Sequence, residues 1–410
     1  MTFETSSKRI LLISGFRIFP ANTGGLVHTG GILRSLARMG HRVAAYSLAG
    51  RQSDYSVSGV FGDSFRVDDI EPNLTEETHL GMTFGVLQTL ARRLDYPRAW
   101  QYALLHRGWI PRRLAQALRE ADIILSDMPW CPRIPGPWAD KPWFLVSHNL
   151  EHRLLEQAAP RQRAFAGWMR NIEAQAPAQY RDIFPCAEAD QDFFRAHDAR
   201  AVLRLPIIRC GVDPSGYAVA PGTRAAIRAQ LRLADADHLL VFSGSRFDPN
   251  LEALAAMREF CRAERAFLEA QRVYILALGS MVSEAFREGP LIATGRVPEV
   301  APYFAAADCG LNPIVRGSGA NVKLFEYLAT RLPVMSTPFG VRGTNLQPVT
   351  DYLSYEPDGL KEAIQIFTGT RSRHEWRVYA EAVWTRHRSS CDIQELVRAA
   401  VLERPEFNGG

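Results

Sequence analysis

The chain has 410 residues, of which 47% are hydrophobic, and a formal net charge of +4 at pH 7. Its length predicts two domains, and its composition is ordinary for a soluble α/β protein. No apolar run reaches the roughly eighteen residues that a membrane-spanning helix needs, and the N-terminal stretch lacks the features of a signal peptide. We therefore expect a cytoplasmic protein. The small net charge neither requires nor excludes an acidic partner.

The first half alternates short apolar runs with amphipathic helices, which is typical of parallel sheets covered on both faces. A helix is predicted from about Val27 to Met39. Strands are predicted at Ile10 to Ser14, Val43 to Ser47, Ile123 to Ser126, Trp143 to Ser147 and Ile183 to Pro185. We expect a Rossmann-like first domain over residues 1–212.

Residues 92–113 interleave arginines with aromatic side chains. Such a segment could dock on an anionic membrane surface or a lipid-linked acceptor, which would make the protein peripheral at the inner face of a membrane. It could equally form a helical pair with a solvated basic face. The sequence leaves both interpretations open, and nothing in it suggests a nucleic-acid partner.

The second half, residues 213–373, repeats the plan of the first after a linker rich in Pro, Gly and Ala. Strands are predicted at Leu239 to Phe242, Val273 to Leu278, Leu291 to Thr294, Cys309 to Leu311 and Val334 to Ser336. Helices are predicted at Asn250 to Arg262, Val297 to Ala307, Asn321 to Arg331 and Gly359 to Phe367. A last amphipathic helix begins at His374, and we expect residues 374–404 to complete the first domain.

No metal site is expected. The cysteines are scattered without the spacing of metal ligands, and most lie in apolar sequence, which favours buried free thiols. Asp235-Ala236-Asp237 has a form that can hold a divalent metal. It lies in a polar stretch before a strand, where a solvated loop is the simpler interpretation. We expect neither a metal nor another cofactor.

The segment from Asn312 to Thr337 is the most informative part of the chain. A strand ends in a glycine-rich loop, and the following helix carries Lys323 and Glu326 on one face. Glycines let backbone amides approach a ligand, and a helix N-terminus favours anions. A cation suits a phosphate and a carboxylate suits sugar hydroxyls, so the pattern predicts a nucleotide-sugar site.

The simpler alternative is a solvated salt bridge between Lys323 and Glu326. The rest of the helix argues against it, because apolar residues surround the pair nearly all round and the helix should be buried. Buried charges need partners, and a ligand is one way to supply them. The loop is not a P-loop, because no Gly-Lys-Ser/Thr triplet follows it.

Four segments together resemble the retaining glycosyltransferases of family 4, which have the GT-B fold. They are the Gly24-Gly25 loop, SHNLE at 147–151, FSGSRFDPN at 242–250, and GRVPEVAPYFAAADCGLNP leading into GSGANVKLFEYLATRLPVMST. The resemblance implies two Rossmann-like domains facing each other across a cleft. It also implies that the donor binds mainly to the second domain.

The resemblance implies roles for the residues of the second domain. Glu326 matches the second glutamate of the family's Glu-x7-Glu motif, which contacts the ribose. The first glutamate is replaced by Ser318, so the donor sugar is left open. Ser318 and the following backbone would take over that role, at Gly319, Ala320, Asn321 and Val322.

Further residues are assigned through the same resemblance. Arg246 follows the first strand of the second domain and would hold the diphosphate, with Lys323 in place of the family's lysine. Arg296 and Val297 lie where relatives cradle the base, although Arg296 could be an ordinary surface cation.

In the first domain, His148 follows a strand where relatives carry a histidine near the sugar and the diphosphate. The alternative is a structural histidine. Gly24 and Gly25 would bring backbone amides to the donor, or form a plain tight turn.

The sequence therefore predicts a retaining glycosyltransferase that uses a nucleoside-diphosphate sugar and a glycan, lipid-linked or other glycoconjugate acceptor. Two alternatives remain open. One is a sugar-nucleotide epimerase of GT-B plan. The other is a catalytically inactive GT-B binding module.

Overall fold

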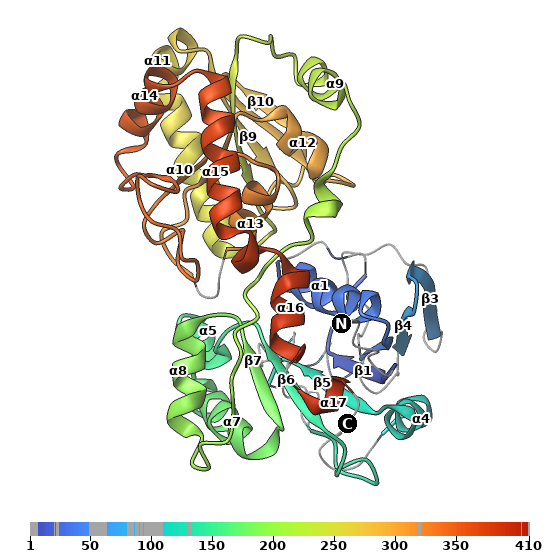
Figure 1. Cartoon of the computed structure of the whole chain (residues 1–410). Coiled ribbons are helices and arrows are strands. Elements are labelled where there is room, and N and C mark those ends of the chain that lie inside the picture. The colour runs from blue at the N-terminus through green and yellow to red at the C-terminus, as the bar shows by residue number, and fades with distance from the viewer. Residues whose placement is uncertain are drawn as a thin grey trace. The chain divides into compact units, whose positions relative to one another are not determined.

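The computed structural model describes residues 7–19, 21, 24–48, 64–79, 86, 90, 93, 110–129, 133–317, 321–402 and 404–408. The chain forms two compact units, residues 1–210 with 393–410 and residues 211–392. Within the described ranges each unit contains one seven-stranded sheet with helices packed on it (Figure 1).

The first sheet has the strand order β3-β4-β2-β1-β5-β6-β7. Its strands are parallel except for the β3–β4 pair. Every residue of β5 and β6 is buried, because helices cover both faces of the central strands. The strands are β1 (Arg9–Ser14), β2 (Arg42–Ser47), β3 (Ser64–Glu71), β4 (Leu74–His79), β5 (Ile123–Asp127), β6 (Trp143–Ser147) and β7 (Asp182–Pro185). The helices include α1 (Gly24–Arg38), α4 (Arg112–Glu120), α5 (Glu151–Glu156), α6 (Pro160–Arg163), α7 (Ala166–Gln179) and α8 (Glu188–His197).

The five strands predicted for the first half are confirmed, but β3 and β4 were missed. These two strands pair antiparallel at the sheet edge and have polar sequences such as LTEETH. Strand prediction here relied on continuous apolar runs, and neither the edge strand β3 nor its neighbour β4 has one.

The second sheet has the order β10-β11-β9-β8-β12-β13-β14. Its strands are β8 (His238–Ser243), β9 (Val273–Leu278), β10 (Phe286–Glu288), β11 (Leu291–Gly295), β12 (Cys309–Asn312), β13 (Val334–Ser336) and β14 (Leu353–Ser354). The helices are η2 (Pro214–Tyr217), α9 (Thr223–Gln230), α10 (Asp248–Ala263), α11 (Arg265–Ala270), α12 (Ala301–Ala306), α13 (Val322–Ala329), α14 (Leu360–Thr370) and α15 (Arg373–Cys391). The predicted strands are again confirmed, and β10 and β14 are short edge strands that were missed.

Helix α12 begins four residues later than the predicted start at Val297. Pro298 follows Val297, and a residue before proline is disfavoured in the helical conformation. The helix therefore starts with its own proline, Pro302, in the first turn.

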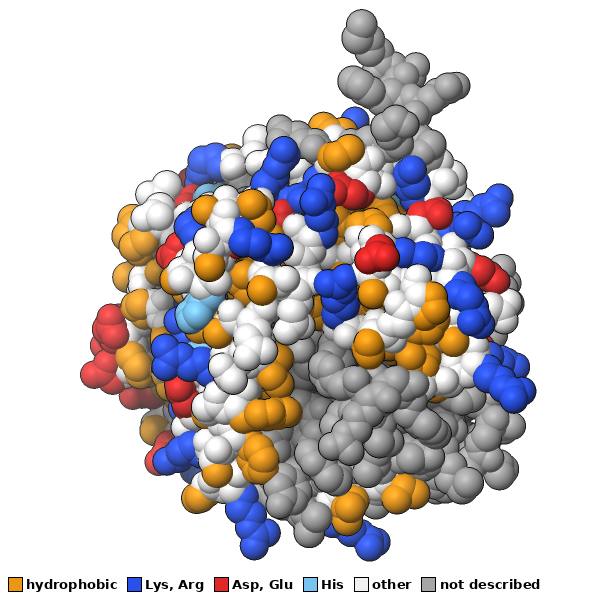
Figure 2. Space-filling model, turned by 90° about the horizontal axis from the view of Figure 1, so that it is seen from below, with side chains coloured by type: hydrophobic (Ala, Val, Ile, Leu, Met, Phe, Trp, Pro, Cys, Tyr) orange, Lys and Arg blue, Asp and Glu red, His pale blue; other side chains and the backbone are white. Residues whose placement is uncertain are grey.

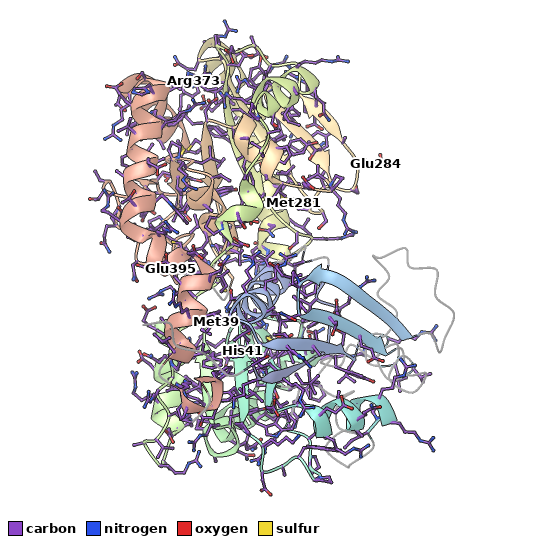
Figure 3. The ribbon with its side chains drawn as sticks, turned by 45° about the vertical axis from the view of Figure 1, so that its right-hand side comes forward. Met39, His41, Met281, Glu284, Arg373 and Glu395 are labelled. Atoms are coloured by element: carbon purple, nitrogen blue, oxygen red, sulfur yellow. The ribbon has the colours of Figure 1, made fainter. Side chains whose placement is uncertain are left out.

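The last helices are divided between the two units, whereas residues 374–404 were predicted to complete the first domain. Helix α15 stays with the second unit, where Trp376 is buried in the core and its Nε1 donates to the Phe367 carbonyl at 2.9 Å. Only residues from Ile393 onward, α16 (Ile393–Leu402) and α17 (Pro405–Asn408), belong to the first unit. Figure 3 labels Arg373 at the start of α15 and Glu395 on α16. From Ile393 onward the chain belongs to the first unit again, because the apolar face of α16 packs into the core of that unit beside α1.

The predicted basic and aromatic segment at 92–113 lies mostly outside the described residues. At its described end, Arg113 on α4 pairs with Glu77, with Nη1 2.7 Å from Oε1. On the face shown in Figure 2, Lys and Arg side chains are spread out with Asp and Glu among them. No helix in the described ranges is long and apolar enough to cross a bilayer. Membrane contact stays a prediction.

Helix α13 packs on β12 through one tight contact. A Cβ added at Gly310 would lie closer than 3.0 Å to the ring of Tyr327. Tyr327 is fully buried, and its hydroxyl accepts a hydrogen bond from the Ser243 backbone N–H at 3.0 Å. The absence of a side chain at Gly310 therefore sets the distance between α13 and the sheet.

We predict that Gly310→Ala lowers the free energy of unfolding by about 1–3 kcal/mol, because the new methyl group overpacks a rigid ring. Gly369→Ala is the matched control, since Gly369 lies in α14 with open space where its Cβ would be. That variant should be neutral or slightly stabilising. Urea denaturation measures both, and equal stability of the two variants would contradict this packing.

Candidate functional site

The carboxyl ends of β12 and β13 are tied to the start of α13 by side-chain amides. Asn312 ends β12, and its Nδ2 donates to the Gly340 carbonyl at 3.0 Å. Asn321, the residue before α13, donates to the same carbonyl at 2.6 Å. Ligands bind at the carboxyl edge of such sheets. The two amides therefore position the helix N-terminus where a ligand would reach it.

Lys323 lies in the first turn of α13 and is 8% exposed. Its Nζ donates to Asn250 Oδ1 at 3.0 Å and lies 4.9 Å from the ring centroid of Phe242. Among the described residues it has no ion-pair partner, so the predicted alternative of a Lys323–Glu326 salt bridge is wrong. Burial lowers the pKa of Lys323 to about 7, opposed by the charge of Glu326 and assisted by that of Arg342.

Glu326 is held one turn further along α13 by Tyr217. The Tyr217 hydroxyl donates to Glu326 Oε1 at 2.9 Å. Burial raises the pKa of Glu326, against the opposing effects of the Tyr217 hydrogen bond and the Lys323 charge. The Tyr217 ring stacks on Phe304 with centroids 6.3 Å apart. Sequence reasoning missed Tyr217, because it lies in the linker and carries no local signal of its role.

Arg342 is a second cation at this edge that sequence reasoning missed. A Cβ built on Gly317 would lie 3.2 Å from Arg342 Nη2, and Gly317 has φ of 130°, which favours glycine. The guanidinium lies 4.2 Å from the centroid of the Phe339 ring, and burial lowers its pKa to about 10. Arg342 lies beyond the carboxyl end of β13, and Gly317 lies beyond the carboxyl end of the neighbouring strand β12. The rule that ligands meet the carboxyl ends of strands could have identified it.

The remaining predicted residues of this unit lie around the same edge. Arg246 follows β8 with an exposed side chain, and its backbone N–H donates to Ser280 Oγ at 3.2 Å. Arg296 and Val297 follow β11, where Arg296 is exposed and Val297 half-buried. Val322 is the buried first residue of α13. The predicted residues Ser318, Gly319 and Ala320 lie outside the described residues.

In the first unit, His148 lies at the carboxyl end of β6 inside a buried polar network. Its Nε2 is 2.8 Å from Asp127 Oδ1, and its Nδ1 is 2.9 Å from Nδ1 of His28. Ser14 and Thr29 donate their hydroxyls to Asp127 at 2.6 and 3.0 Å. Three neighbouring strand ends and α1 therefore meet at Asp127, which the sequence did not single out.

The hydrogen bonds define the protonation of both histidines. His28 Nε2 lies 3.0 Å from the Ile208 carbonyl, which only accepts, so this nitrogen carries a proton. Burial and the charge of His148 lower the pKa of His28 to about 3, so its Nδ1 is a bare acceptor at neutral pH. His148 must then donate from Nδ1 to His28 and from Nε2 to the carboxylate.

His148 is therefore an imidazolium. Burial opposes this charge, but the hydrogen bond and the charge of Asp127 outweigh it and raise the pKa of His148. Burial also works against the charge of Asp127, whose pKa is nevertheless lowered by hydrogen bonds from His148, Ser14 and Thr29. Both ring nitrogens of His148 have internal partners. Its predicted action on the donor would thus have to come from charge rather than from direct contact.

Gly24 and Gly25 form the first turn of α1 rather than a loop. Nothing described lies within 4 Å of a Cβ placed on Gly25, so the surroundings there are open. Their backbone amides are at a helix N-terminus, where orphan N–H groups favour an anion. The predicted donor contact at these glycines stays a prediction.

The Asp-x-Asp motif forms a structural turn. The Asp237 carboxylate accepts from the Ala234 N–H at 2.6 Å and from Arg272 Nε at 2.9 Å. In the described part of the chain no cluster of three or more His, Cys, Asp or Glu residues could hold a metal ion. The described cysteines are buried free thiols.

Part of the second unit matches a family of known proteins. Residues 237–367 match the family model described as Glycosyl transferases group 1. A comparison with curated protein sequences finds no relative. The second unit therefore contains a glycosyl transferases group 1 domain.

Solved structures resemble the chain over nearly its whole length. Sucrose-phosphate synthase of Thermosynechococcus elongatus is 16% identical with a TM-score of 0.65, covering 98% of this chain and 100% of that one. HepE of Anabaena, solved with UDP and glucose, is 15% identical with a TM-score of 0.63, covering 96% and 98%. A UDP-forming trehalose-phosphate synthase of Burkholderia xenovorans is 16% identical with a TM-score of 0.62, covering 98% and 99%. The fold is GT-B, and the domain match and the fold together support a glycosyltransferase.

We predict that His28 makes the protein sensitive to mild acid. Its folded pKa of about 3 lies below the unfolded value of about 6.5, so its contribution to stability is present above pH 6.5 and is lost as pH falls toward 3. Relative to His28→Asn, the wild type should lose up to about 1.4 kcal/mol of unfolding free energy per pH unit below about pH 6. Urea denaturation of both proteins at a series of pH values in this range measures how the free energy of unfolding depends on pH.

His374→Asn is the control, because His374 is exposed on α15. The dependence of its unfolding free energy on pH should match that of the wild type. If His28→Asn shows that same dependence, the neutral state assigned to His28 is wrong.

Proposed function

We propose that the chain is a retaining glycosyltransferase that transfers a sugar from a nucleoside-diphosphate sugar to a glycan, lipid-linked or other glycoconjugate acceptor. The observation that carries the proposal is the pair Lys323 and Glu326. They are one helical turn apart on α13, yet each has a different partner instead of pairing with the other. A ligand with a phosphate end and a hydroxyl end matches such a pair.

The diphosphate would bind between Lys323 and Arg342 at the N-terminus of α13. Both cations lie beside the glycine loop, and burial lowers the pKa of each. A bound diphosphate would place negative charge beside both of them. The same cations would stabilise the charge that develops on the β-phosphate as the glycosidic bond breaks. With this charge available, we propose that neither a metal ion nor another cofactor takes part.

Retention of configuration would follow from attack on the same face as the leaving group. Of the two carboxylates described in the candidate sites, Glu326 is held by Tyr217, and Asp127 is held by Ser14, Thr29 and His148. Neither is free to act as a nucleophile. The acceptor hydroxyl would form the new C–O bond while the bond to the diphosphate breaks, and the departing phosphate would take the hydroxyl proton.

UDP is the first nucleotide to test, because HepE was solved with UDP and the Burkholderia trehalose-phosphate synthase is UDP-forming. We place the reaction in the cytoplasm, with family 4 as the class that the motifs resemble. The test is incubation with UDP-glucose and related UDP-sugars, with and without acceptor mixtures. A transferase releases UDP when acceptor is present, and Lys323→Ala should release almost none.

Two other outcomes would contradict the proposal. Interconversion of UDP-sugars without an acceptor would identify an epimerase. Binding of UDP without turnover on any donor would indicate an inactive GT-B binding module.

We predict that Glu326 recognises the ribose hydroxyls. The wild type should bind UDP more tightly than 2′-deoxy-UDP, and Glu326→Ala should weaken UDP binding by about 1.5–3 kcal/mol, as expected for a charge-assisted hydrogen bond. The variant should also lose the preference between the two nucleotides. Isothermal titration calorimetry measures both quantities.

Tyr217→Phe is the matched control, because it removes the hydrogen bond to Glu326 but leaves the carboxylate in place. It should keep the preference for UDP. If Glu326→Ala keeps that preference too, then Glu326 does not contact the ribose.

A further inference from the structure

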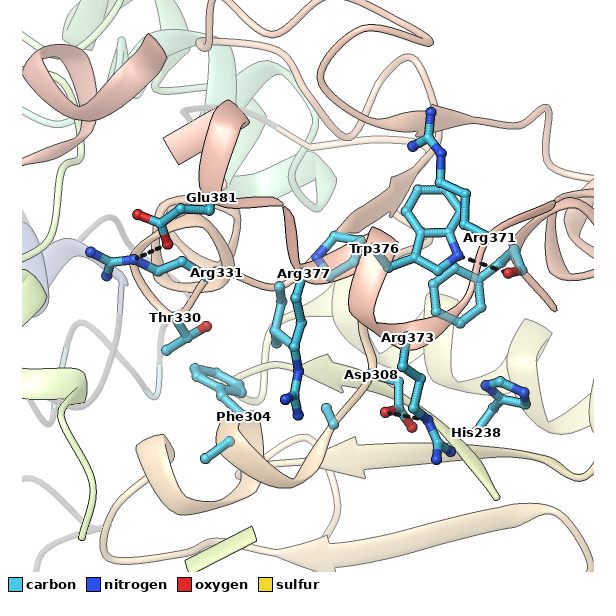
Figure 4. A pocket seen from close by; sticks show the side chains of 15 residues that line it. His238, Phe304, Asp308, Thr330, Arg331, Arg371, Arg373, Trp376, Arg377 and Glu381 are labelled. Carbon is cyan, nitrogen blue, oxygen red and sulfur yellow. Dashed lines mark hydrogen bonds and ion pairs between the residues drawn. The ribbon is translucent and has the colours of Figure 1, made fainter. Parts of the chain in front are cut away.

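A hollow lies at the opposite edge of the second sheet from the N-terminus of α13. It is lined by residues at the amino ends of three strands: His238 begins β8, Asp308 precedes β12 and Pro333 precedes β13. The ends of α12, α13 and α14 and the first turns of α15 complete its walls (Figure 4). Its volume is about 340 Å³. All lining residues belong to the second unit.

The walls carry more positive charge than the nearby acids can balance. Four arginines line the hollow, Arg331, Arg371, Arg373 and Arg377, against two acids, Asp308 and Glu381.

Asp308 is already shared by three guanidinium groups. Arg224 Nη2 lies 2.6 Å from its Oδ1, Arg373 Nε 3.2 Å from Oδ1, and Arg228 Nη1 3.4 Å from Oδ2. It cannot neutralise further cations.

Two of the arginines are not neutralised by an ion pair in the described part of the chain, although Arg371 attracts the charge of nearby Glu375. Arg371 stacks over the rings of Trp376 and Tyr379, at 4.6 and 4.7 Å from their centroids. Arg377 is exposed and reaches from α15 toward Phe304 in Figure 4. Neither forms an ion pair with a described residue. Stacking holds the Arg371 fork in place while leaving its N–H groups able to bind an anion.

We propose that this hollow binds a small phosphate monoester. Arginine forks recognise phosphate oxygens bidentately, and Arg371 and Arg377 are the groups free to do so. Leu332 and Trp376 supply a small apolar part of the wall for the ester's organic body. The volume is at the small end of the roughly 300–1,000 Å³ typical of ligand pockets, so a nucleotide sugar is too large.

This site is separate from the one proposed for the donor. Helix α13 spans the distance between them, with Lys323 in its first turn and Thr330 and Arg331 just after its last residue. The proposal therefore does not depend on the proposed function, and a variant of either site leaves the other intact.

The test uses the full chain and calorimetric titration with phenyl phosphate and inorganic phosphate. Arg371→Gln/Arg377→Gln should weaken phenyl phosphate binding at least tenfold. Arg262→Gln, which replaces an exposed arginine at the end of α10 that does not line the hollow, should change it less than twofold. Phenyl phosphate should bind more tightly than inorganic phosphate, because only the ester contacts the apolar wall.

Several results would overturn the proposal. They are no binding by the wild type at millimolar phenyl phosphate, equal binding of inorganic phosphate, or unchanged binding by the double variant. Thermal unfolding checks that the double variant is folded. If it is destabilised, Arg377→Gln alone carries the test, because that exposed side chain has no ion-pair partner among the described residues.

Discussion

The burial of the Lys323 ammonium is the constraint around which the candidate site is organised. A buried lysine normally has a carboxylate partner, but among the described residues this one contacts the Asn250 amide and the Phe242 ring without forming an ion pair. Its pKa of about 7 when folded lies below the unfolded value of about 10.4. Folding therefore releases a proton between these values, and the stability gained at high pH is lost as pH falls toward 7. An anion that binds the charged form offsets this cost. We therefore interpret the residues beside Lys323 as parts of an anion-binding site.

The second unit places this lysine by fixing one short helix. Gly310 allows Tyr327 to pack against β12, and Asn312 and Asn321 hold the start of α13 to the loop after β13. The first unit also contains a buried cation, His148, but stabilises its charge in a different way. There the His148 charge is balanced internally by Asp127 and oriented by His28, so the ring needs no ligand to be stable. One unit therefore has an unbalanced buried cation and the other a balanced one.

Much of the fold followed from the sequence, for physical reasons. Central strands such as β6 and β9 are continuous apolar runs, and Lys323 stands out because it interrupts an apolar helix. Strands at or next to a sheet edge, such as β3 and β4, gave no such signal. Tyr217 and Arg342 were missed because their roles arise from contacts with Glu326 and the glycine loop, far away in sequence. His148 was singled out, but its charge state depends on His28 and Asp127, and no local pattern connects these three residues.

The most direct measurement is the pKa of Lys323, obtained by NMR titration of protein with isotope-labelled lysine side chains. The other lysines are Lys8, Lys141 and Lys361, so the Lys323 signal can be assigned with a single Lys323→Ala variant. The account predicts titration near pH 7 in the free protein and a clear rise of the pKa when UDP saturates the site. An ordinary pKa near 10.4 in the free protein, or a low pKa that UDP leaves unchanged, would contradict it.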